Sequence, residues 1–196
     1  KNGLDDKADS IDVLITTPIA YNATSNGLLK KADSTATTRT CWWTHRYPIA
    51  SYLVAISATN FSISTDTVSL EGTVMPLMQH CYPGYESYYQ NAFPRTKNGL
   101  RIFTRYFGPY PFIRERYGHT QFLWGGGMEH QTNITFPNKF EFIKIGESDY
   151  SANLYHEYGH EWWANKVTNK DWAHMWIQEG INTYAEALIH YELGGQ

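Results

Sequence analysis

The chain has 196 residues, of which 42% are hydrophobic, 16% aromatic and 18% charged, and its formal net charge is −3. This is the composition of a globular protein rather than a disordered one. The near-balance of charge gives no reason to expect a nucleic-acid partner. No run of about 18 apolar residues is present, which excludes a membrane span. Two cysteines, Cys41 and Cys81, are too few for a disulfide scaffold.

The first third of the chain has the pattern of a β-sheet region. Residues 11–17 alternate between apolar and polar, which predicts a strand. Asn26-Gly27 predicts a turn between two short extended runs. Residues 34–40 are rich in Ser and Thr and predict a loop, and residues 51–57 are rich in β-forming residues. Nothing in residues 1–65 has a helical period, so we place a domain boundary between residues 65 and 66.

The rest of the chain mixes strands and helices. We expect a short strand over 67–74, helical stretches over 85–107 interrupted by Pro94 and Asn98-Gly99, and a break at 108–111. Residues 121–124 and 129–136 predict extended segments on either side of three glycines. Residues 151–167 and 176–193 predict two helices, the second ending before Gly194-Gly195. The pattern is that of an α+β protein.

The first predicted helix carries the sequence His156-Glu-Tyr-Gly-His160, an H-E-x-x-H arrangement. Residues four apart lie on one face of a helix, so both imidazoles can bind one Zn²⁺ from the same side. Glu157, beside the first histidine, can reach a metal-bound water and take its proton while the hydroxide attacks a carbonyl. The motif therefore predicts a single zinc ion with Glu157 as the general base.

A catalytic zinc normally has three protein ligands and one open position. Glu179 is the candidate for the third, because it opens the second helix and eighteen residues separate it from His160. Thr183, Glu186 and His190 follow Glu179 at helical spacing. One of them is expected to support a ligand through a hydrogen bond.

A glycine-rich segment, Gly125-Gly-Gly-Met-Glu-His130, precedes the zinc helix. Glycines before an extended segment let another backbone approach closely. A substrate peptide could lie along this edge as an added strand, with Glu129 meeting a positively charged group. Taken alone, the segment also fits a glycine loop that carries a solvated carboxylate.

Together these motifs resemble the aminopeptidase N family of gluzincin metallopeptidases, which includes leukotriene hydrolase. Gly126-Gly-Met-Glu-His130 is similar to the family's G-x-M-E-N exopeptidase motif. His156, His160 and Glu179 match its H-E-x-x-H-x18-E signature. Similarity extends through Trp162–Thr168 and Trp176–Gly180 between and around the ligands, through Phe107–Phe112, and through 21–27 and 48–55. It therefore covers nearly the whole chain.

The resemblance implies a fold and an activity. The fold would be the end of an N-terminal β-sheet saddle domain, followed by the first part of a thermolysin-like α/β zinc peptidase domain. The activity would be that of an aminopeptidase acting on peptides with a free N-terminal amine. In that family, the positions of His156, His160 and Glu179 bind zinc, and Glu157 is the base. Glu129 would bind the substrate α-amine, and Gly126, Gly127 and Met128 would contact the substrate backbone.

The chain departs from the family pattern in three ways. His130 stands where the motif usually has Asn, which could alter the support of Glu129. Glu161 stands where Gln or Ser is more usual and adds negative charge next to a ligand. The chain is also much shorter than family members, and no tyrosine in it matches the family's transition-state tyrosine. We therefore expect a fragment that lacks its true N-terminus and that self-associates through faces left uncovered.

Two other interpretations stay open. A thermolysin-type endopeptidase would share the zinc helix, although an amine-binding carboxylate at Glu129 would penalise substrates that continue upstream. A non-catalytic module that binds zinc or peptides would fit the absent tyrosine, although nothing structural demands a glutamate at position 157.

Overall fold

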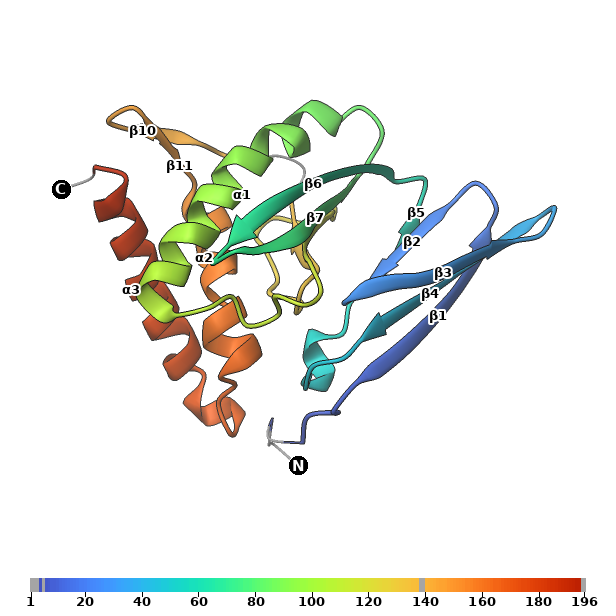
Figure 1. The fold of residues 1–196 in the computed structure, drawn as a ribbon, viewed down its shortest axis with the longest axis horizontal. Helices are drawn as coiled ribbons and strands as arrows, with labels where there is room; N and C mark the ends of the chain where they lie inside the picture. The colour runs from blue at the N-terminus through green and yellow to red at the C-terminus, as the bar shows by residue number, and fades with distance from the viewer. Residues whose placement is uncertain (1–3, 5, 138–139, 195–196) are drawn as a thin grey trace.

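The computed structural model describes residues 4, 6–137 and 140–194. Figure 1 shows the N-terminal strands on the right and the helices on the left, with a central sheet between them. This order of a β-sheet region followed by a mixed region confirms the predicted α+β fold. Among the described residues, no helix has the length and apolar character needed to span a membrane.

The N-terminal region consists of two small antiparallel sheets. The first has the order β1-β4-β3 and the second pairs β2 with β5. Their bounds are Ile11–Pro18 (β1), Asn22–Ser25 (β2), Leu28–Ser34 (β3), Thr38–His45 (β4) and Ile56–Thr59 (β5). In β1 the apolar side chains of Ile11, Val13 and Ile15 alternate with exposed residues, as the sequence predicts.

The central sheet has the order β6-β7-β8-β9. Strands β6 and β7 form an antiparallel hairpin, whereas β7–β8 and β8–β9 are parallel. The bounds are Ser62–Leu70 (β6), Thr73–Cys81 (β7), Tyr117–Gln121 (β8) and Ile134–Phe136 (β9), and a separate hairpin joins Ile143–Ile145 (β10) to Ser148–Tyr150 (β11). The proposed boundary at residues 65 and 66 falls within β6, and the division into two domains stays a prediction.

Three helices cover the central sheet: α1 (Glu86–Phe107), α2 (Ala152–Gly159) and α3 (Trp176–Glu192). Short turns of irregular helix lie at Ser51–Leu53 (η1), Glu161–Lys166 (η2) and Trp172–His174 (η3). The main hydrophobic core joins these layers through buried side chains from the sheet and all three helices, including Leu77, Phe103, Tyr117, Tyr158 and Ile189. Burial of this surface is the main stabilising contribution to the arrangement.

Several local predictions were wrong. The loop over 34–40 is only a turn between β3 and β4, and the run over 51–57 contains the helical turn η1 before β5 begins. The strand expected over 67–74 is the tip of the β6–β7 hairpin, because Glu71 and Gly72 adopt positive φ values of 49° and 83° there. Residues 121–124 and 129–136 are mostly turn and loop, with β8 ending at Gln121 and β9 beginning at Ile134.

The two helix predictions around prolines and histidines also need correction. Helix α1 continues through Pro94 instead of breaking. Proline in a helix interior costs about 3 kcal/mol, but Ala92 and Phe93 beside it are buried in the core. Gly99 lets α2 approach α1, because a Cβ there would lie 2.8 Å from the Tyr155 ring. The helix predicted over 151–167 ends at Gly159, where an irregular turn follows.

Candidate metal centre and peptide site

Helices α2 and α3 bring the three predicted zinc ligands together. His156 lies on α2 and His160 caps its C-terminal end one turn later, and their Nε2 atoms are 3.0 Å apart. The Glu179 Oε2 atom on α3 lies 3.4 Å from His156 Nε2 and 3.6 Å from His160 Nε2. One donor atom from each of the three therefore faces a common point. Two imidazoles and a carboxylate are a donor set that suits Zn²⁺.

The other ring nitrogens of both histidines are held by hydrogen bonds. His156 Nδ1 lies 2.6 Å from the Glu186 carboxylate, one of the three residues suggested by helical spacing. His160 Nδ1 lies 2.9 Å from the carbonyl oxygen of Trp163. Such contacts place the Nδ1 protons, so that each Nε2 atom can bind a metal once its own proton has left.

The irregular turn after α2 makes the His160 contact available. Trp163 and Ala164 have non-helical backbone angles, and the Val167 amide donates to Trp162 O instead of to the Trp163 carbonyl. The Trp163 carbonyl therefore remains free for the His160 ring. The helical spacing of apolar residues in the sequence continues through this turn, so the sequence does not indicate that the backbone leaves helical geometry here.

Electrostatics in the cluster favour a cation. Burial lowers the pKa of His156, but hydrogen bonds to Glu179 and Glu186 outweigh this effect and raise it to about 10. Hydrogen bonds from the two histidines hold the pKa of Glu179 well below its usual range. The carboxylates of Glu179 and Glu186 stabilise extra protons on the imidazole rings, and a divalent cation can replace those protons.

Glu157 faces the glycine-rich segment. Its side chain is buried, and its Oε2 atom has no hydrogen-bond partner among the described residues. Burial raises the pKa of Glu157 to about 7. A Cβ atom on Gly127 would lie 2.5 Å from the Glu157 Cδ atom, so the carboxylate occupies space that only a glycine leaves. A carboxyl group with a pKa near neutrality suits proton transfer.

Glu129 lies on the same side of the cluster. A carboxylate oxygen of Glu129, one of Glu157 and a ring nitrogen of His160 all lie within 4.8 Å of one another. The Glu129 backbone is anchored by Asn165, whose Nδ2 donates to the Glu129 carbonyl at 2.9 Å. Asn165 belongs to the irregular turn, which therefore positions both His160 and Glu129. Sequence reasoning did not single out Asn165.

The two departures in sequence have local structural consequences. His130 lies 3.3 Å from the Thr135 hydroxyl through Nδ1, and burial lowers its pKa to about 4. Glu161 accepts a hydrogen bond from the Thr132 amide at 3.0 Å. Burial raises the pKa of Glu161 to about 8. Burial therefore opposes the negative charge that the sequence suggests next to the ligand.

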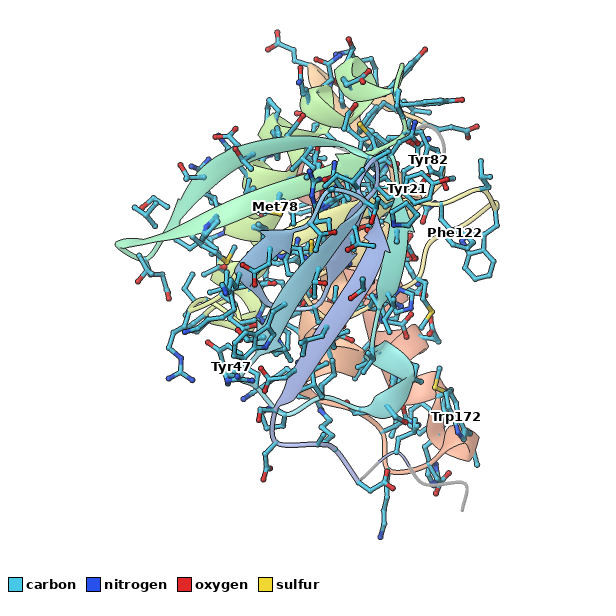
Figure 2. The ribbon with its side chains drawn as sticks, turned by 90° about the vertical axis from the view of Figure 1, so that its right-hand side faces the viewer. Tyr21, Tyr47, Met78, Tyr82, Phe122 and Trp172 are labelled. Carbon is cyan, nitrogen blue, oxygen red and sulfur yellow. The ribbon has the colours of Figure 1, made fainter. Side chains whose placement is uncertain are left out.

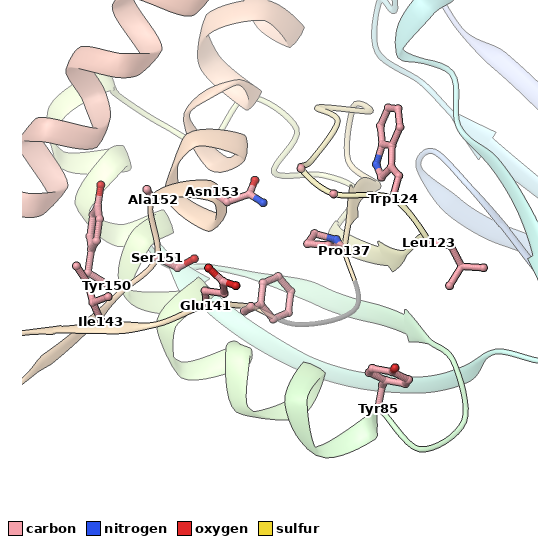
Figure 3. Close-up of a pocket in the computed structure, with 13 residues that line it drawn as sticks. Tyr85, Leu123, Trp124, Pro137, Glu141, Ile143, Tyr150, Ser151, Ala152 and Asn153 are labelled. Atoms are coloured by element: carbon pink, nitrogen blue, oxygen red, sulfur yellow. The ribbon is translucent and has the colours of Figure 1, made fainter.

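A cavity of about 850 Å³ lies next to the glycine-rich segment. Gly125 and Gly126 line it together with Trp124 and the first residues of the zinc helix, Ser151–Asn153. Figure 3 shows Asn153 and Ser151 on one side of this space and Trp124 and Leu123 on another. The segment that was predicted to meet substrate therefore borders an open space.

Comparison with known protein families matches residues 92–196 to the Peptidase family M1 domain. The chain belongs to peptidase family M1. The predicted resemblance to the aminopeptidase N family is thereby confirmed. The match includes the glycine-rich segment, both helices of the metal cluster and the irregular turn between them.

Individual relatives agree with the family match. The M1 chain is 27% identical over 146 residues to aminopeptidase N of Streptomyces lividans, covering 71% of this chain and 17% of the relative. It is 39% identical over 70 residues to leucine aminopeptidase 2-1 of Meyerozyma guilliermondii, covering 36% of this chain and 11% of the relative. It thus spans less than a fifth of the length of these relatives.

Solved structures extend the likeness to the N-terminal strands. The M1 zinc metallopeptidase of Deinococcus radiodurans superposes with a TM-score of 0.85 at 26% identity, covering 97% of this chain and 42% of that one. A mutant of the same enzyme bound to a Tyr-Ser-Ala substrate gives a TM-score of 0.84 at 25% identity, with the same coverage. The match supports the β-sheet domain followed by the start of an α/β domain.

Proposed function

We propose that this chain carries the active site of a zinc-dependent aminopeptidase, which hydrolyses the first peptide bond of peptides with a free N-terminal amine. The observation that carries the proposal is the placement of three groups together. The His156–His160–Glu179 cluster lies on one side of Glu157, and the Glu129 carboxylate lies within 4.8 Å of Glu157 and His160. The residues that would activate water through a metal therefore lie close to Glu129, whose negative charge could pair with a substrate amine.

Each residue then has a defined task. His156, His160 and Glu179 would hold one Zn²⁺, which supplies a water of lowered pKa and polarises the substrate carbonyl. Glu157 accepts the proton of the attacking water at its carboxylate and passes it to the leaving amine. Burial raises the pKa of the Glu157 carboxyl, which favours its taking up that proton.

Substrate would lie along the glycine-rich segment. Gly126 and Gly127 let the peptide backbone approach closely, and the adjacent cavity gives the chain room to continue. The backbone of Met128 already exchanges two hydrogen bonds with Thr135, at 3.1 and 3.0 Å, so Met128 would contact substrate through its side chain. Glu129 would pair with the α-amine. That pairing limits cleavage to the first residue.

The test is hydrolysis of leucyl-aminocoumarin and of its N-acetylated twin by the purified chain, each with and without a chelator. We expect cleavage of the free-amine substrate only, and loss of that cleavage with the chelator. Equal cleavage of both substrates would overturn the aminopeptidase proposal in favour of a thermolysin-type endopeptidase. Cleavage of neither by a zinc-loaded chain would favour the non-catalytic binding module.

Glu129→Gln and Glu157→Gln separate the two carboxylate roles. We expect Glu157→Gln to retain zinc and lose turnover, because Glu157 is outside the ligand set. We expect Glu129→Gln to lose its preference for the free amine over the acetylated substrate. Zinc content, measured on each purified variant, reports whether the ligand cluster is intact.

The expectation of self-association is also retained as a proposal. The side chains of Trp176, Tyr184 and Tyr191 on α3 are 68%, 63% and 71% exposed. Large exposed aromatic surfaces favour association. Sedimentation equilibrium across a range of concentrations would detect it, and a monomer at all concentrations would contradict it.

A further inference from the structure

A tight turn follows the proposed amine-binding residue Glu129. The Asn133 amide donates to the His130 carbonyl at 2.9 Å, which closes a β-turn with Gln131 and Thr132 at its centre. Thr132 is fully buried and has a φ of 61°. A positive φ at the third residue of a β-turn usually requires glycine, and it is unfavourable for a β-branched side chain. The turn therefore holds Thr132 in a conformation that threonine does not adopt by preference.

Two contacts hold Thr132 in this conformation. Its backbone amide donates to Glu161 Oε1 at 3.0 Å, and its hydroxyl accepts the Gly27 amide at 2.8 Å. Glu161 directly follows the proposed ligand His160, whereas Gly27 lies between β2 and β3 in the β-sheet region. Position 27 must itself be a glycine, because a Cβ there would lie 2.1 Å from the Thr44 carbonyl oxygen. A strained residue persists only where the surrounding contacts impose its conformation.

The β-sheet region holds the same turn at a second point. Asn26 Nδ2 donates to the Gln131 carbonyl at 2.6 Å, and this buried contact joins residues 105 positions apart in the chain. The segment that leads into the glycine-rich segment also lies beside the β-sheet region, because Phe122 and residues 54–57 line one cavity (Figure 2). The turn after Glu129 is therefore fixed by the β-sheet region as well as by the residues that follow the zinc helix.

We propose that Thr132 is a positioning residue, whose strained turn fixes the direction in which the Glu129 carboxylate meets the substrate α-amine. This inference rests on the proposed aminopeptidase function and deepens it. Asn165 holds the Glu129 backbone at its carbonyl, and the turn around Thr132 holds the chain three residues later. Gly27 and Glu161 keep that turn in place. The β-sheet region thereby contributes to the selectivity of a site whose proposed metal ligands all lie elsewhere.

The test is the binding of leucinamide and N-acetyl-leucinamide, measured by calorimetry on the zinc-loaded chain and its Thr132→Val variant. Valine keeps the shape of threonine but leaves the Gly27 amide without its acceptor, so one of the two contacts that impose the positive φ is lost. We expect leucinamide to bind about tenfold more weakly, as for loss of one hydrogen bond to a charged group, with the acetylated ligand unaffected. On leucyl-aminocoumarin, KM should rise by a similar factor while kcat stays within about twofold, because the amine contact is made equally in the ground and transition states.

Two further variants at the same position separate the hydroxyl from the backbone strain. Thr132→Ser keeps the hydroxyl and removes the β-branch that makes a positive φ costly, so we expect it to bind leucinamide as the parent chain does. Thr132→Gly adopts a positive φ without strain but lacks the hydroxyl. It therefore tests the contact with Gly27 without adding strain to the fold, and we expect it to lose leucinamide affinity as Thr132→Val does.

Thr96→Val is the matched control for the loss of a buried threonine hydroxyl. The Thr96 hydroxyl donates to the Ala92 carbonyl at 2.9 Å within α1 and contacts the Tyr158 hydroxyl at 2.6 Å. We expect this variant to melt at a lower temperature and to keep the parent ratio of the two affinities. Melting temperature and zinc content, measured for every variant, separate a local effect from unfolding.

The outcomes distinguish this inference from the function on which it rests. Weaker binding of leucinamide alone in Thr132→Val and Thr132→Gly, with Thr132→Ser like the parent chain, supports it. Unchanged leucinamide affinity in those two variants, together with a loss in Glu129→Gln, overturns the role of Thr132 and leaves the aminopeptidase proposal standing. Equal weakening of both ligands, or the same change of ratio in Thr96→Val, overturns it as well, because either result indicates a general structural effect. If the parent chain itself does not distinguish the two ligands, the amine-binding role of Glu129 fails and the Thr132 proposal fails with it.

Discussion

Gly127→Ala should displace Glu157, the proposed general base, without touching a proposed metal ligand. A Cβ atom at position 127 would lie 2.5 Å from the Glu157 Cδ atom and 2.6 Å from its Cγ atom, whereas ordinary contacts begin at 3.4 Å. The carboxylate or the glycine-rich segment must therefore move by about 0.9 Å, the difference between 3.4 and 2.5 Å. A misplacement of about 1 Å commonly costs a factor of about 100 in rate. We expect kcat on leucyl-aminocoumarin to fall by about that factor.

The matched control is Gly125→Ala, two residues earlier in the same segment. No atom lies within 4 Å of the Cβ position there, and neither glycine has the positive φ that would strain an alanine. Gly125→Ala should therefore keep the parent kcat, and both variants should keep one zinc per chain. A Gly127→Ala variant with kcat within threefold of the parent would refute the proposed contact with Glu157. Equal losses in both variants would instead indicate that the segment needs general flexibility.

Three further predictions follow from buried contacts. Glu186→Gln should weaken zinc binding by about 10- to 100-fold, as is typical for partners of metal-bound histidines, in a chelator competition where the exposed Glu147→Gln serves as the control. Gly99→Ala should lower the free energy of unfolding by about 1–3 kcal/mol, because its Cβ would overlap two tyrosine rings at 2.8 and 2.9 Å. Gly180→Ala is the control and should leave the free energy of unfolding unchanged, because the space at its Cβ position is open. Burial raises the pKa of Glu161 to about 8. The contribution of this carboxyl to the free energy of unfolding is therefore complete below about pH 4.5 and is lost as the pH rises towards 8. Relative to the parent, Glu161→Gln should gain stability over that window by up to about 1.4 kcal/mol per pH unit. A pH-independent difference in denaturant unfolding would contradict this last prediction.

Much of the metal cluster was predictable, because helical spacing is a local property. Two histidines four residues apart must share a face of any helix that contains them, and Glu186 follows Glu179 by two helical turns on the same face. The alternation in β1 was predictable for a similar reason, since side chains of a strand point in alternate directions. These features need no knowledge of how distant segments pack.

Local signals failed where tertiary packing outweighed them. Pro94 predicts a break, but the surrounding helix buries enough apolar surface to continue through it. Residues 161–166 keep an apolar pattern, yet the chain leaves helical geometry there and frees the Trp163 carbonyl for His160. Glu161 looks like an added charge in sequence. Only the tertiary structure shows that this carboxyl is buried, which raises its pKa even though the hydrogen bond from the Thr132 amide lowers it.

The sequence by itself predicted the proposed ligand set, the proposed base beside it and the glycine-rich segment, because each is a short pattern whose chemistry depends on residue type and spacing. Only the tertiary structure decided that Glu129 lies within 4.8 Å of Glu157 and His160. These contacts join residues 28 and 31 positions apart in the chain. Their proximity is a property of the packed core, which no local periodicity encodes.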